Sequence, residues 1–263
     1  MEPDYKNWVP KGMVTAMCVA SVILGILWVC SFNVAIFEGG AQKTLQIVLG
    51  IIFILLCLFS LWYVYLYQTF SYKGKKQFAK RVIDRVSNYV EIPEGGTGLD
   101  VGCGSAALTI ACARKNPGAK MVGLDRWGKE YASFNKPLCE NNAKAEGVAG
   151  QVSFVNGDAR KLPFEDETFD AVTGNYCIHN IPEKDRQAII LESLRILKKG
   201  GVFAIHDLFS KSKYGDMNIL VNKLKDMGYE KVELLDTTNG LFMSPSEATV
   251  LCMKGSALLV GKK

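Results

Sequence analysis

The hydrophobic pattern of the chain begins with two long apolar runs. Gly12–Phe37 contains no charged residue, and neither does Thr44–Tyr72. Each run exceeds the ~20 residues that a helix needs to cross the hydrocarbon core of a bilayer. A buried helix of a soluble protein keeps a polar face, and neither run has one. We therefore predict two transmembrane helices, at about residues 12–37 and 44–70, rather than an apolar core hairpin.

A secretory signal sequence is a poor alternative for the first run. Its flank, MEPDYKNWVPKG, sets Glu2 and Asp4 against Lys6 and Lys11, so the flank is not clearly positive. The apolar run is also longer than the roughly 7–15 residues of a signal peptide. The first run is therefore interpreted as a helix that stays in the membrane.

Charge predicts the orientation of the two helices. The link between them, EGGAQK, is short, so they form an antiparallel hairpin. Cations follow the second run, whereas the link holds only Glu38 and Lys43; these cations are Lys73, Lys75, Lys76, Lys80 and Arg81. The positive-inside rule then predicts a two-pass integral membrane protein with both termini in the cytoplasm. The cations would also attract anionic membrane lipid.

From residue 73 onward, strand-like and helix-like stretches alternate. The strand-like stretches are TGLDVG, AKMVGLD, VSFVNGD, FDAVTGN, VFAIHD, KVELLDT and ALLVGKK, and helices are predicted between them, including 129–148 and 183–201. This alternation predicts an α/β fold: a Rossmann-like, doubly wound and mostly parallel seven-stranded sheet. The predicted domains are a transmembrane hairpin at 1–72 and a soluble domain at 73–263, which would lie in the cytoplasm.

Composition narrows the chemistry. The eight cysteines include no C-x-x-C pair, and the two histidines cannot complete a zinc set. We predict free thiols and no metal site. The net charge of +5 is mild, and basic residues do not interleave with aromatic ones, so no nucleic-acid partner is predicted. The sequence specifies no oligomeric state.

The stretch LDVGCGSAAL, residues 99–108, indicates a cofactor site. Gly102, Gly104 and Ala107 fit the dinucleotide pattern G-x-G-x-x-G/A, and Asp125 follows at the distance of a ribose-binding carboxylate. A P-loop is excluded because no G-K-[ST] follows. The glycines alone leave a dinucleotide and another adenosine cofactor open. Asp100 within the turn favours a cofactor that has a cationic amine and no pyrophosphate.

Four stretches in order resemble the class I S-adenosylmethionine-dependent methyltransferases: LDVGCGSAAL, MVGLD, NGDARKLPFEDETFDAVTGNYCIHNIP and LRILKKGGVFAIHD. The resemblance covers roughly residues 75–263, and the two membrane helices lie outside it. LPFEDETFD is similar to the small-molecule branch, such as the quinone and sterol methyltransferases. The resemblance implies a membrane-tethered methyltransferase that uses S-adenosyl-L-methionine and a small-molecule or lipid-like acceptor.

The resemblance also implies roles for residues of the first two strand ends. Asp100, Gly102 and Gly104 would line the methionine portion of the cofactor, and Asp125 would accept the ribose hydroxyls. Each has a structural alternative: the glycines would serve a sharp turn, and Asp125 would cap the following helix. Arg126 or Trp127 would lie against the adenine, although a tryptophan there also suits simple packing.

Three further residues receive cofactor-binding roles by the same resemblance. Asp158 would bond the adenine amino group, with Ala159 beside it, or would be an ordinary turn residue. Asn175 would lie at the methionine portion and face the acceptor. The segment 239–256 holds apolar side chains that would cap an apolar acceptor or form ordinary core.

Methyl transfer is an in-line displacement with a good leaving group, so orientation supplies much of the catalysis. A base is required only where the acceptor must lose a proton. His179 and His206 are the candidates because histidine titrates near neutral pH, and His206 and Asp207 end a strand at the ligand edge. Two other functions stay open: an NAD(P)-dependent oxidoreductase or epimerase, and a non-catalytic cofactor-binding membrane protein.

Overall fold

The computed structural model describes residues 2–34, 36–128 and 133–263. The chain divides into two compact units. One is Asn7–Lys80, and the other combines residues 2–6 with Arg81–Lys263. The segment that precedes the first helix thus belongs to the larger unit. The domain boundary at 72/73 stays a prediction from the sequence.

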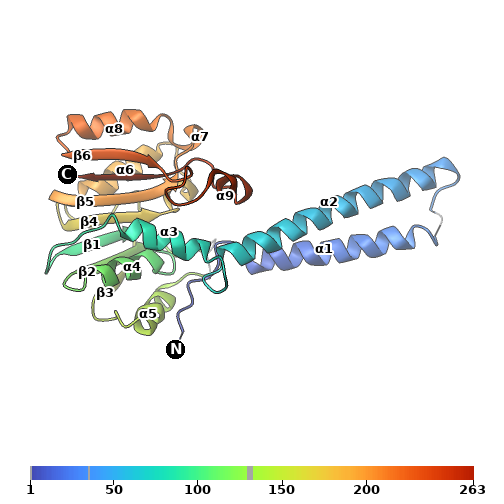
Figure 1. The fold of residues 1–263 in the computed structure, drawn as a ribbon, viewed down its shortest axis with the longest axis horizontal. Helices are drawn as coiled ribbons and strands as arrows, with labels where there is room; N and C mark the ends of the chain where they lie inside the picture. The colour runs from blue at the N-terminus through green and yellow to red at the C-terminus, as the bar shows by residue number, and fades with distance from the viewer. Residues whose placement is uncertain (1, 35, 129–132) are drawn as a thin grey trace. The chain divides into compact units, whose positions relative to one another are not determined.

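The smaller unit contains a helical hairpin, α1 (Lys11–Cys30) and α2 (Gly40–Phe70), drawn in blue and cyan in Figure 1. α1 ends before the expected residue 37, and α2 begins before Thr44. The side-chain amides of Gln42 and Gln46 both donate to the Ser31 carbonyl, at 2.6 and 2.9 Å. These bonds satisfy a carbonyl just past the end of α1, and hydropathy does not reveal such a contact.

Small residues allow the two helices to pack closely. A Cβ added at Gly25 would lie 2.9 Å from the Phe53 ring, and one at Gly50 would lie 2.9 Å from the Trp28 ring. The Ser21 hydroxyl bonds across the hairpin to that of Ser60 at 2.9 Å. Only 6 % of the most apolar stretch of α1 and 11 % of that of α2 is buried. A core hairpin of a soluble protein would be mostly buried, so this exposure favours a lipid environment.

The larger unit is built on a seven-stranded sheet with the order β3-β2-β1-β4-β5-β7-β6. The first five strands run parallel, and β7 runs antiparallel to both β5 and β6. This arrangement confirms the Rossmann-like, mostly parallel fold. The strands are β1 (Thr97–Val101), β2 (Lys120–Asp125), β3 (Val152–Asn156), β4 (Phe169–Asn175), β5 (Leu197–Leu208), β6 (Lys231–Asp236) and β7 (Ser256–Lys262).

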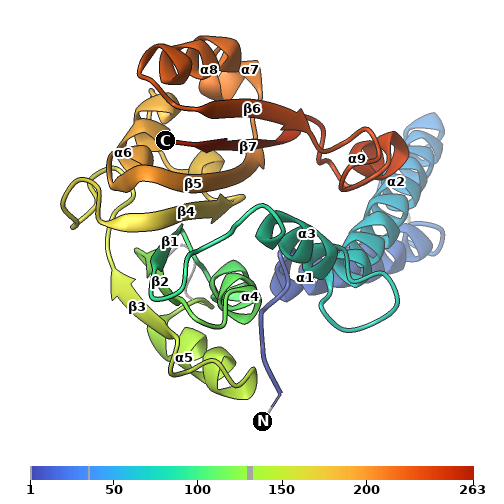
Figure 2. The same cartoon turned by 60° about the vertical axis from the view of Figure 1, so that its left-hand side comes forward.

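Helices lie on both faces of this sheet, and α9 (Pro245–Val250) lies beyond the ends of its strands, as Figure 2 shows. The other helices are α3 (Phe78–Ser87), α4 (Ala107–Lys115), α5 (Lys136–Ala145), α6 (Arg186–Arg195), α7 (Lys211–Tyr214) and α8 (Met217–Asp226), with a 3₁₀ turn, η2, at Ile178–Asn180. One face of β1, β4 and β5 packs Leu99, Val172 and Phe203 into a core with Ile190 of α6 and Leu220 of α8. This core therefore fixes the positions of the strands whose carboxyl ends form the site.

The predicted helix at 183–201 is wrong after Arg195. α6 ends at Arg195, and β5 begins at Leu197, which pairs with Phe169 before the register shifts. The Lys198 ammonium lies 2.9 Å from the Asp170 carboxylate of β4, so its partner is on a strand. The helix predicted at 129–148 is shorter, α5, capped by the Asn135 side chain; residues 129–132 lie outside the described residues.

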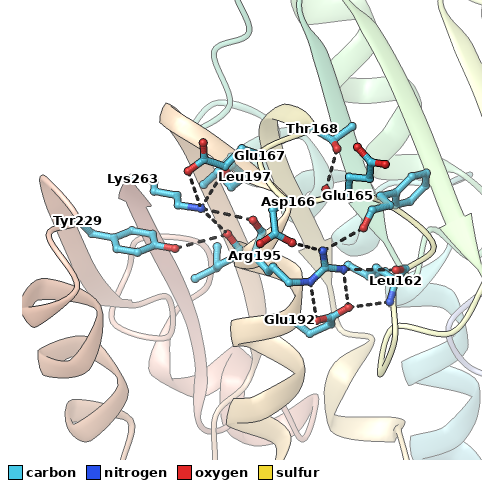
Figure 3. Close-up of polar contacts among 12 residues, drawn as sticks. Leu162, Glu165, Asp166, Glu167, Thr168, Glu192, Arg195, Leu197, Tyr229 and Lys263 are labelled. Atoms are coloured by element: carbon cyan, nitrogen blue, oxygen red, sulfur yellow. Dashed lines mark hydrogen bonds and ion pairs between the residues drawn. The ribbon is translucent and has the colours of Figure 1, made fainter.

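The stretch LPFEDETFD lies at the amino end of β4, opposite the ligand edge. Figure 3 shows Arg195, the last residue of α6, at its centre. The Arg195 guanidinium donates to the Phe164 carbonyl at 3.0 Å, to Asp166 at 2.5 Å and to Glu192 at 2.9 Å. The hydrogen bond with Arg195 lowers the pKa of Glu192. The stretch therefore joins α6 to the start of β4.

Candidate active site

The carboxyl ends of the parallel strands bring most of the predicted site residues to one edge of the sheet. β1 leads into Gly102, β2 ends at Asp125 and β4 ends at Asn175, while Asp207 is the penultimate residue of β5. Open α/β sheets bind ligands at this edge, where the strand order reverses. In this sheet the reversal lies between β1 and β4.

The glycine-rich turn is closed by β2. The backbone N–H groups of Gly102 and Cys103 both donate to the Leu124 carbonyl, at 2.8 and 3.0 Å. Gly102 has φ +74°, and a Cβ there would lie 1.9 Å from the Cys177 sulfur, so only glycine fits. Gly104 has φ +56°, and among the described residues no atom beyond its chain neighbours lies within 4 Å of where its Cβ would be. The turn is therefore tightly packed at Gly102 and open at Gly104.

Asp125 joins the turn to the residues that follow β2. Its carboxylate accepts from the Gly104 N–H at 2.9 Å and from the Trp127 N–H at 2.8 Å. The Trp127 indole returns a bond to the Gly104 carbonyl at 3.1 Å. Arg126 is held through its carbonyl by the Asn156 amide at 2.8 Å. Gly104, Asp125 and Trp127 thus form one interlocked cluster.

Asp158 and Ala159 follow β3 at the same edge. The Arg160 guanidinium grips the Asp158 carboxylate at 2.6 to 3.1 Å, and this pairing lowers the pKa of Asp158. Ala159 is buried. The sequence analysis did not identify Arg160 as a partner of Asp158. A residue two positions after an aspartate is nevertheless well placed to bond its carboxylate across a turn. The adenine contact of Asp158 stays a prediction.

Asp100 is buried beneath the turn rather than exposed on it. Its carboxylate accepts from the Thr109 hydroxyl of α4 at 2.6 Å and from the Thr173 hydroxyl of β4 at 3.1 Å. Burial raises its pKa to about 6. The carboxylate ties α4 and β4 together beneath the glycine turn. A direct contact with the cofactor stays a prediction.

Asn175 and His206 are neighbours across β4 and β5. The His206 Nδ1 lies 2.8 Å from the Asn175 Oδ1, and its Nε2 lies 3.1 Å from the Thr237 hydroxyl. The His206 side chain has no exposed surface, and burial lowers its pKa to about 3. Both ring nitrogens are occupied, so the ring suits holding Asn175 better than accepting a proton from a substrate.

His179 forms the second histidine pair of the site. Its Nδ1 is hydrogen-bonded to the Asp207 carboxylate, which also accepts the His179 backbone N–H at 3.2 Å. The His179 side chain is 12 % exposed and that of Asp207 only 1 %. A buried carboxylate thus orients an imidazole that keeps a small exposed surface at the carboxyl edge of the sheet. Burial and the charge of Asp207 raise the pKa of the buried Tyr214 phenol.

Three residues at this edge have a strained backbone. Ala106, Trp127 and Tyr176 have φ values of 69°, 44° and 48°, in the left-handed region. Non-glycine residues avoid this region because Cβ crowds the following carbonyl. These residues follow β1, β2 and β4 respectively. Strain of this kind persists where surrounding contacts enforce it, and it is frequent in active sites.

The residues present fit S-adenosylmethionine. The open space over Gly104 admits a ligand close to the backbone. The Asp125 carboxylate accepts two backbone hydrogen bonds and keeps lone pairs for ribose hydroxyls. The Asp100 carboxyl lies beneath the turn, on the side where the methionine portion of the cofactor is cationic. The segment 239–256 gives no free apolar cap, because Phe242, Met243, Leu251 and Met253 are all buried.

Comparison with known families narrows the function of the larger unit. Residues 99–205 match the family described as a methyltransferase domain. This match and the site residues together support S-adenosylmethionine as the cofactor. The match begins within β1, contains β2, β3 and β4 and ends within β5, so it includes the carboxyl ends of the first four strands and stops just before His206 and Asp207.

The chain is also similar to individual curated methyltransferases. The chain is 29 % identical to a sterol 4-C-methyltransferase of Caenorhabditis elegans over 150 residues, which cover 56 % of this chain and 42 % of the relative. It is 35 % identical to a demethylmenaquinone methyltransferase of Bacillus cytotoxicus over 113 residues, 43 % of this chain and 44 % of the relative. The chain thus spans less than half the length of these two relatives.

Solved structures show the same fold. The cyclase SpnF aligns with a TM-score of 0.56 at 21 % identity, over 73 % of this chain and 84 % of that one. A geranyl diphosphate methyltransferase in complex with SAM aligns with a TM-score of 0.50 at 14 % identity, over 70 % and 84 %. One fold therefore serves a cyclase and a methyltransferase, so the acceptor chemistry has to be argued from the site.

Proposed function

We propose that this protein is a membrane-tethered methyltransferase that transfers a methyl group from S-adenosylmethionine to a small, lipid-like acceptor at the cytoplasmic surface. The observation that carries the proposal is the closure of the glycine turn on Asp125, within a methyltransferase domain. That cluster offers a carboxylate for ribose beside a backbone that a ligand can approach. An NAD(P) enzyme would use similar glycines, but the family match favours methyl transfer.

The chain's own residues would hold the cofactor as follows. Asp125 accepts the ribose hydroxyls, the open face of Gly104 receives the methionine portion, and Asp158 accepts the adenine amino group. Trp127 fixes the turn through the Gly104 carbonyl. When bound, S-adenosylmethionine supplies a methyl group on a cationic sulfur that leaves as a neutral thioether. Orientation by these contacts lowers the barrier without a covalent enzyme adduct.

His179 is the base that the geometry favours. Asp207 holds the Nδ1 of His179, so Nε2 is the nitrogen left to take a proton. Nε2 would take the proton that an oxygen or carbon of the acceptor loses when it is methylated. His206, with both nitrogens engaged and no exposed surface, positions Asn175 instead.

The lipid-like acceptor is supported by the relatives and the hairpin together. The relatives are named for sterol and demethylmenaquinone, both apolar ring compounds. Two helices long and apolar enough to cross a membrane precede the domain. The cations at 73–81 would hold the chain against anionic headgroups at about 1 kcal/mol each. An acceptor dissolved in that membrane would be concentrated near the tethered domain.

Topology is supported by a contact as well as by charge. The Asp4 N–H, before α1, donates to the Asn142 side chain of the methyltransferase domain at 2.7 Å. The segment before the hairpin and the domain after it therefore share one side of any membrane. That arrangement requires an even number of crossings, which two spanning helices supply. The lysine-rich flank then favours the cytoplasm for both.

The deciding experiment uses the full chain in lipid nanodiscs. S-adenosylhomocysteine should bind and, at a hundredfold excess over Kd, raise stability by about 2.7 kcal/mol. Asp125→Ala should weaken binding at least about tenfold. Asp236→Ala is the matched control, since Asp236 also ends a strand but bonds only its own turn, at Thr238 and Asn239. Equal binding of NAD, or no loss in Asp125→Ala, would contradict the cofactor assignment.

The acceptor is then sought with labelled cofactor. Methyl transfer should appear in membrane lipid extract and not in soluble extract. Transfer into the soluble extract alone would contradict the lipid-like acceptor and leave the cofactor assignment intact. With the acceptor in hand, a chain that lacks residues 7–72 and rejoins the flanks tests delivery. Equal rates on vesicle-borne acceptor would show that the hairpin only localises the enzyme.

A further inference from the structure

We propose that Asp4 and Tyr5, which precede the first membrane helix, form a strap that positions the glycine-rich turn for the cofactor. The inference rests on the proposed function, because it assigns these residues to the cofactor site of the same enzyme. The methyltransferase domain is then completed by residues on the far side of the hairpin in sequence. The hairpin is an insertion between the strap and the rest of the domain.

Asn142 of α5 is the residue that receives the strap. Its side-chain oxygen accepts the Asp4 N–H at 2.7 Å, and its amide donates to the Asp4 carbonyl at 3.0 Å. The same amide donates to the Ser105 carbonyl at 2.9 Å. Asn142 is only 1 % exposed. One buried amide therefore binds the strap and the glycine-rich turn at once, and a buried amide left unsatisfied is costly.

The strap also contacts the turn directly. The Ser105 hydroxyl donates to the Tyr5 carbonyl at 2.8 Å, and the Tyr5 phenol donates to the Glu146 carboxylate at 3.1 Å. Burial, followed by the charge of Glu146, raises the pKa of Tyr5 and keeps the phenol a donor. Figure 2 shows the chain before α1 running near α5. The strap thus has a partner at each of its two residues.

Ser105 is the point through which the strap acts on the site. It stands between Gly104, whose backbone bonds Asp125 and Trp127, and Ala106, which is strained at φ 69°. Ala106 precedes α4 without a side-chain cap. Bonds to both the hydroxyl and the carbonyl of Ser105 hold this turn in its strained form. The strap therefore favours the backbone conformation that leaves Gly104 open.

The test compares two substitutions at one position in the full chain in nanodiscs. Asp4→Pro removes the N–H that Asn142 accepts, whereas Asp4→Ala keeps it and removes only the carboxylate, which bonds Lys6. Loss of one such bond corresponds to about a fivefold change in affinity. We expect S-adenosylhomocysteine to bind about fivefold more weakly to Asp4→Pro than to Asp4→Ala. Amides 102–106 should exchange hydrogen faster in Asp4→Pro without ligand.

If Asp4→Pro disturbs folding, Tyr5→Phe provides a second and less disruptive variant. It removes the phenol that bonds Glu146 and should speed exchange at 102–106 to a smaller extent. Equal affinity of both Asp4 variants together with unchanged exchange would overturn the strap. If the wild-type chain binds no S-adenosylhomocysteine, the proposed function fails, while the exchange rates still decide whether the strap holds the turn.

Discussion

Asn175 and His206 are register partners on adjacent parallel strands, and a 2.8 Å hydrogen bond joins the amide oxygen of Asn175 to the Nδ1 of His206. Thr237 occupies the other ring nitrogen, and Phe242 packs on the ring with centroids 5.1 Å apart. The histidine is therefore a fixed support for a residue at the ligand edge. Its environment predicts a pH dependence of stability.

His206→Gln should remove an acid-sensitive part of the free energy of unfolding. The folded pKa is about 3, whereas an unfolded histidine titrates near 6.5. Between these values the unfolded state binds the extra proton, so the contribution is full above pH 6.5 and is lost as pH falls toward 3. The slope is at most about 1.4 kcal/mol per pH unit. Denaturation of both proteins from pH 7.5 to 4 measures the difference.

Asp100 has the opposite effect on the pH dependence of stability. This effect cancels when the free energy of unfolding of the variant is subtracted from that of the wild type. Asp100 has a folded pKa raised to about 6, so it stabilises the fold at low pH and loses that contribution as pH rises through 6. A wild-type stability that fell no faster than that of His206→Gln between pH 6.5 and 4 would show that His206 is protonated in the folded state.

His179→Gln should lower kcat without weakening the binding of S-adenosylhomocysteine. The glutamine keeps a polar side chain but cannot take the proton, and general-base catalysis contributes at least about a hundredfold. Asp207→Asn should lower kcat by a smaller factor, since the imidazole stays but loses its orienting carboxylate. Steady-state kinetics and calorimetry separate the two effects. An unchanged kcat in His179→Gln would mean that the acceptor needs no base at this position.

Gly102→Ala should mainly lower the stability of the domain, whereas Gly104→Ala should mainly weaken ligand binding. The first places a Cβ 1.9 Å from the Cys177 sulfur at φ +74°, so the free energy of unfolding should fall by at least about 2 kcal/mol. The second meets no atom of the described residues within 4 Å beyond its chain neighbours and should cost about 1 kcal/mol, yet it fills the space over the turn and should weaken S-adenosylhomocysteine binding. Equal losses of stability would contradict this division.

Arg195→Lys should destabilise the domain without affecting the cofactor. Lysine cannot reproduce the fork that bonds Phe164, Asp166 and Glu192, and we expect a loss of about 2 kcal/mol. Lys262→Ala breaks an exposed ion pair with Glu230 and should cost less than about 1 kcal/mol. Denaturant titration compares them. A change in S-adenosylhomocysteine affinity would mean that this end of the sheet communicates with the site.

Cysteine labelling of sealed cells tests the membrane topology. In a chain whose exposed Cys30 and Cys252 are replaced by serine, a cysteine at Glu38 should react with an impermeant reagent from outside. One at Lys225, an exposed residue of α8, should react only after lysis. Labelling of the Lys225 site in intact cells would place the domain outside and separate it from cytosolic S-adenosylmethionine.

The order of elements was predictable because it depends on local patterns. Uncharged runs indicate the two long helices, and short apolar stretches separated by helices indicate the strands, six of which lie within two residues of their predicted limits. The glycine turn was also predictable, since Gly102 and Gly104 stand in a G-x-G pattern directly after a short apolar stretch, and both adopt positive φ. The start of β5 was not, because Leu197–Gly201 continues the helical pattern and pairs with a distant strand.

The partners of the site residues depend on how distant segments meet, which no local pattern records. Asp207 reaches His179 because η2 follows β4 at the end of the sheet where β5 also ends. His206 and Asp207 are adjacent in sequence, but adjacent residues of a strand point to opposite faces of the sheet. His206 is therefore enclosed by Asn175, Thr237 and Phe242. Asp207 points the other way and orients His179. Asn142 likewise meets Asp4 across 138 residues of chain through folding alone.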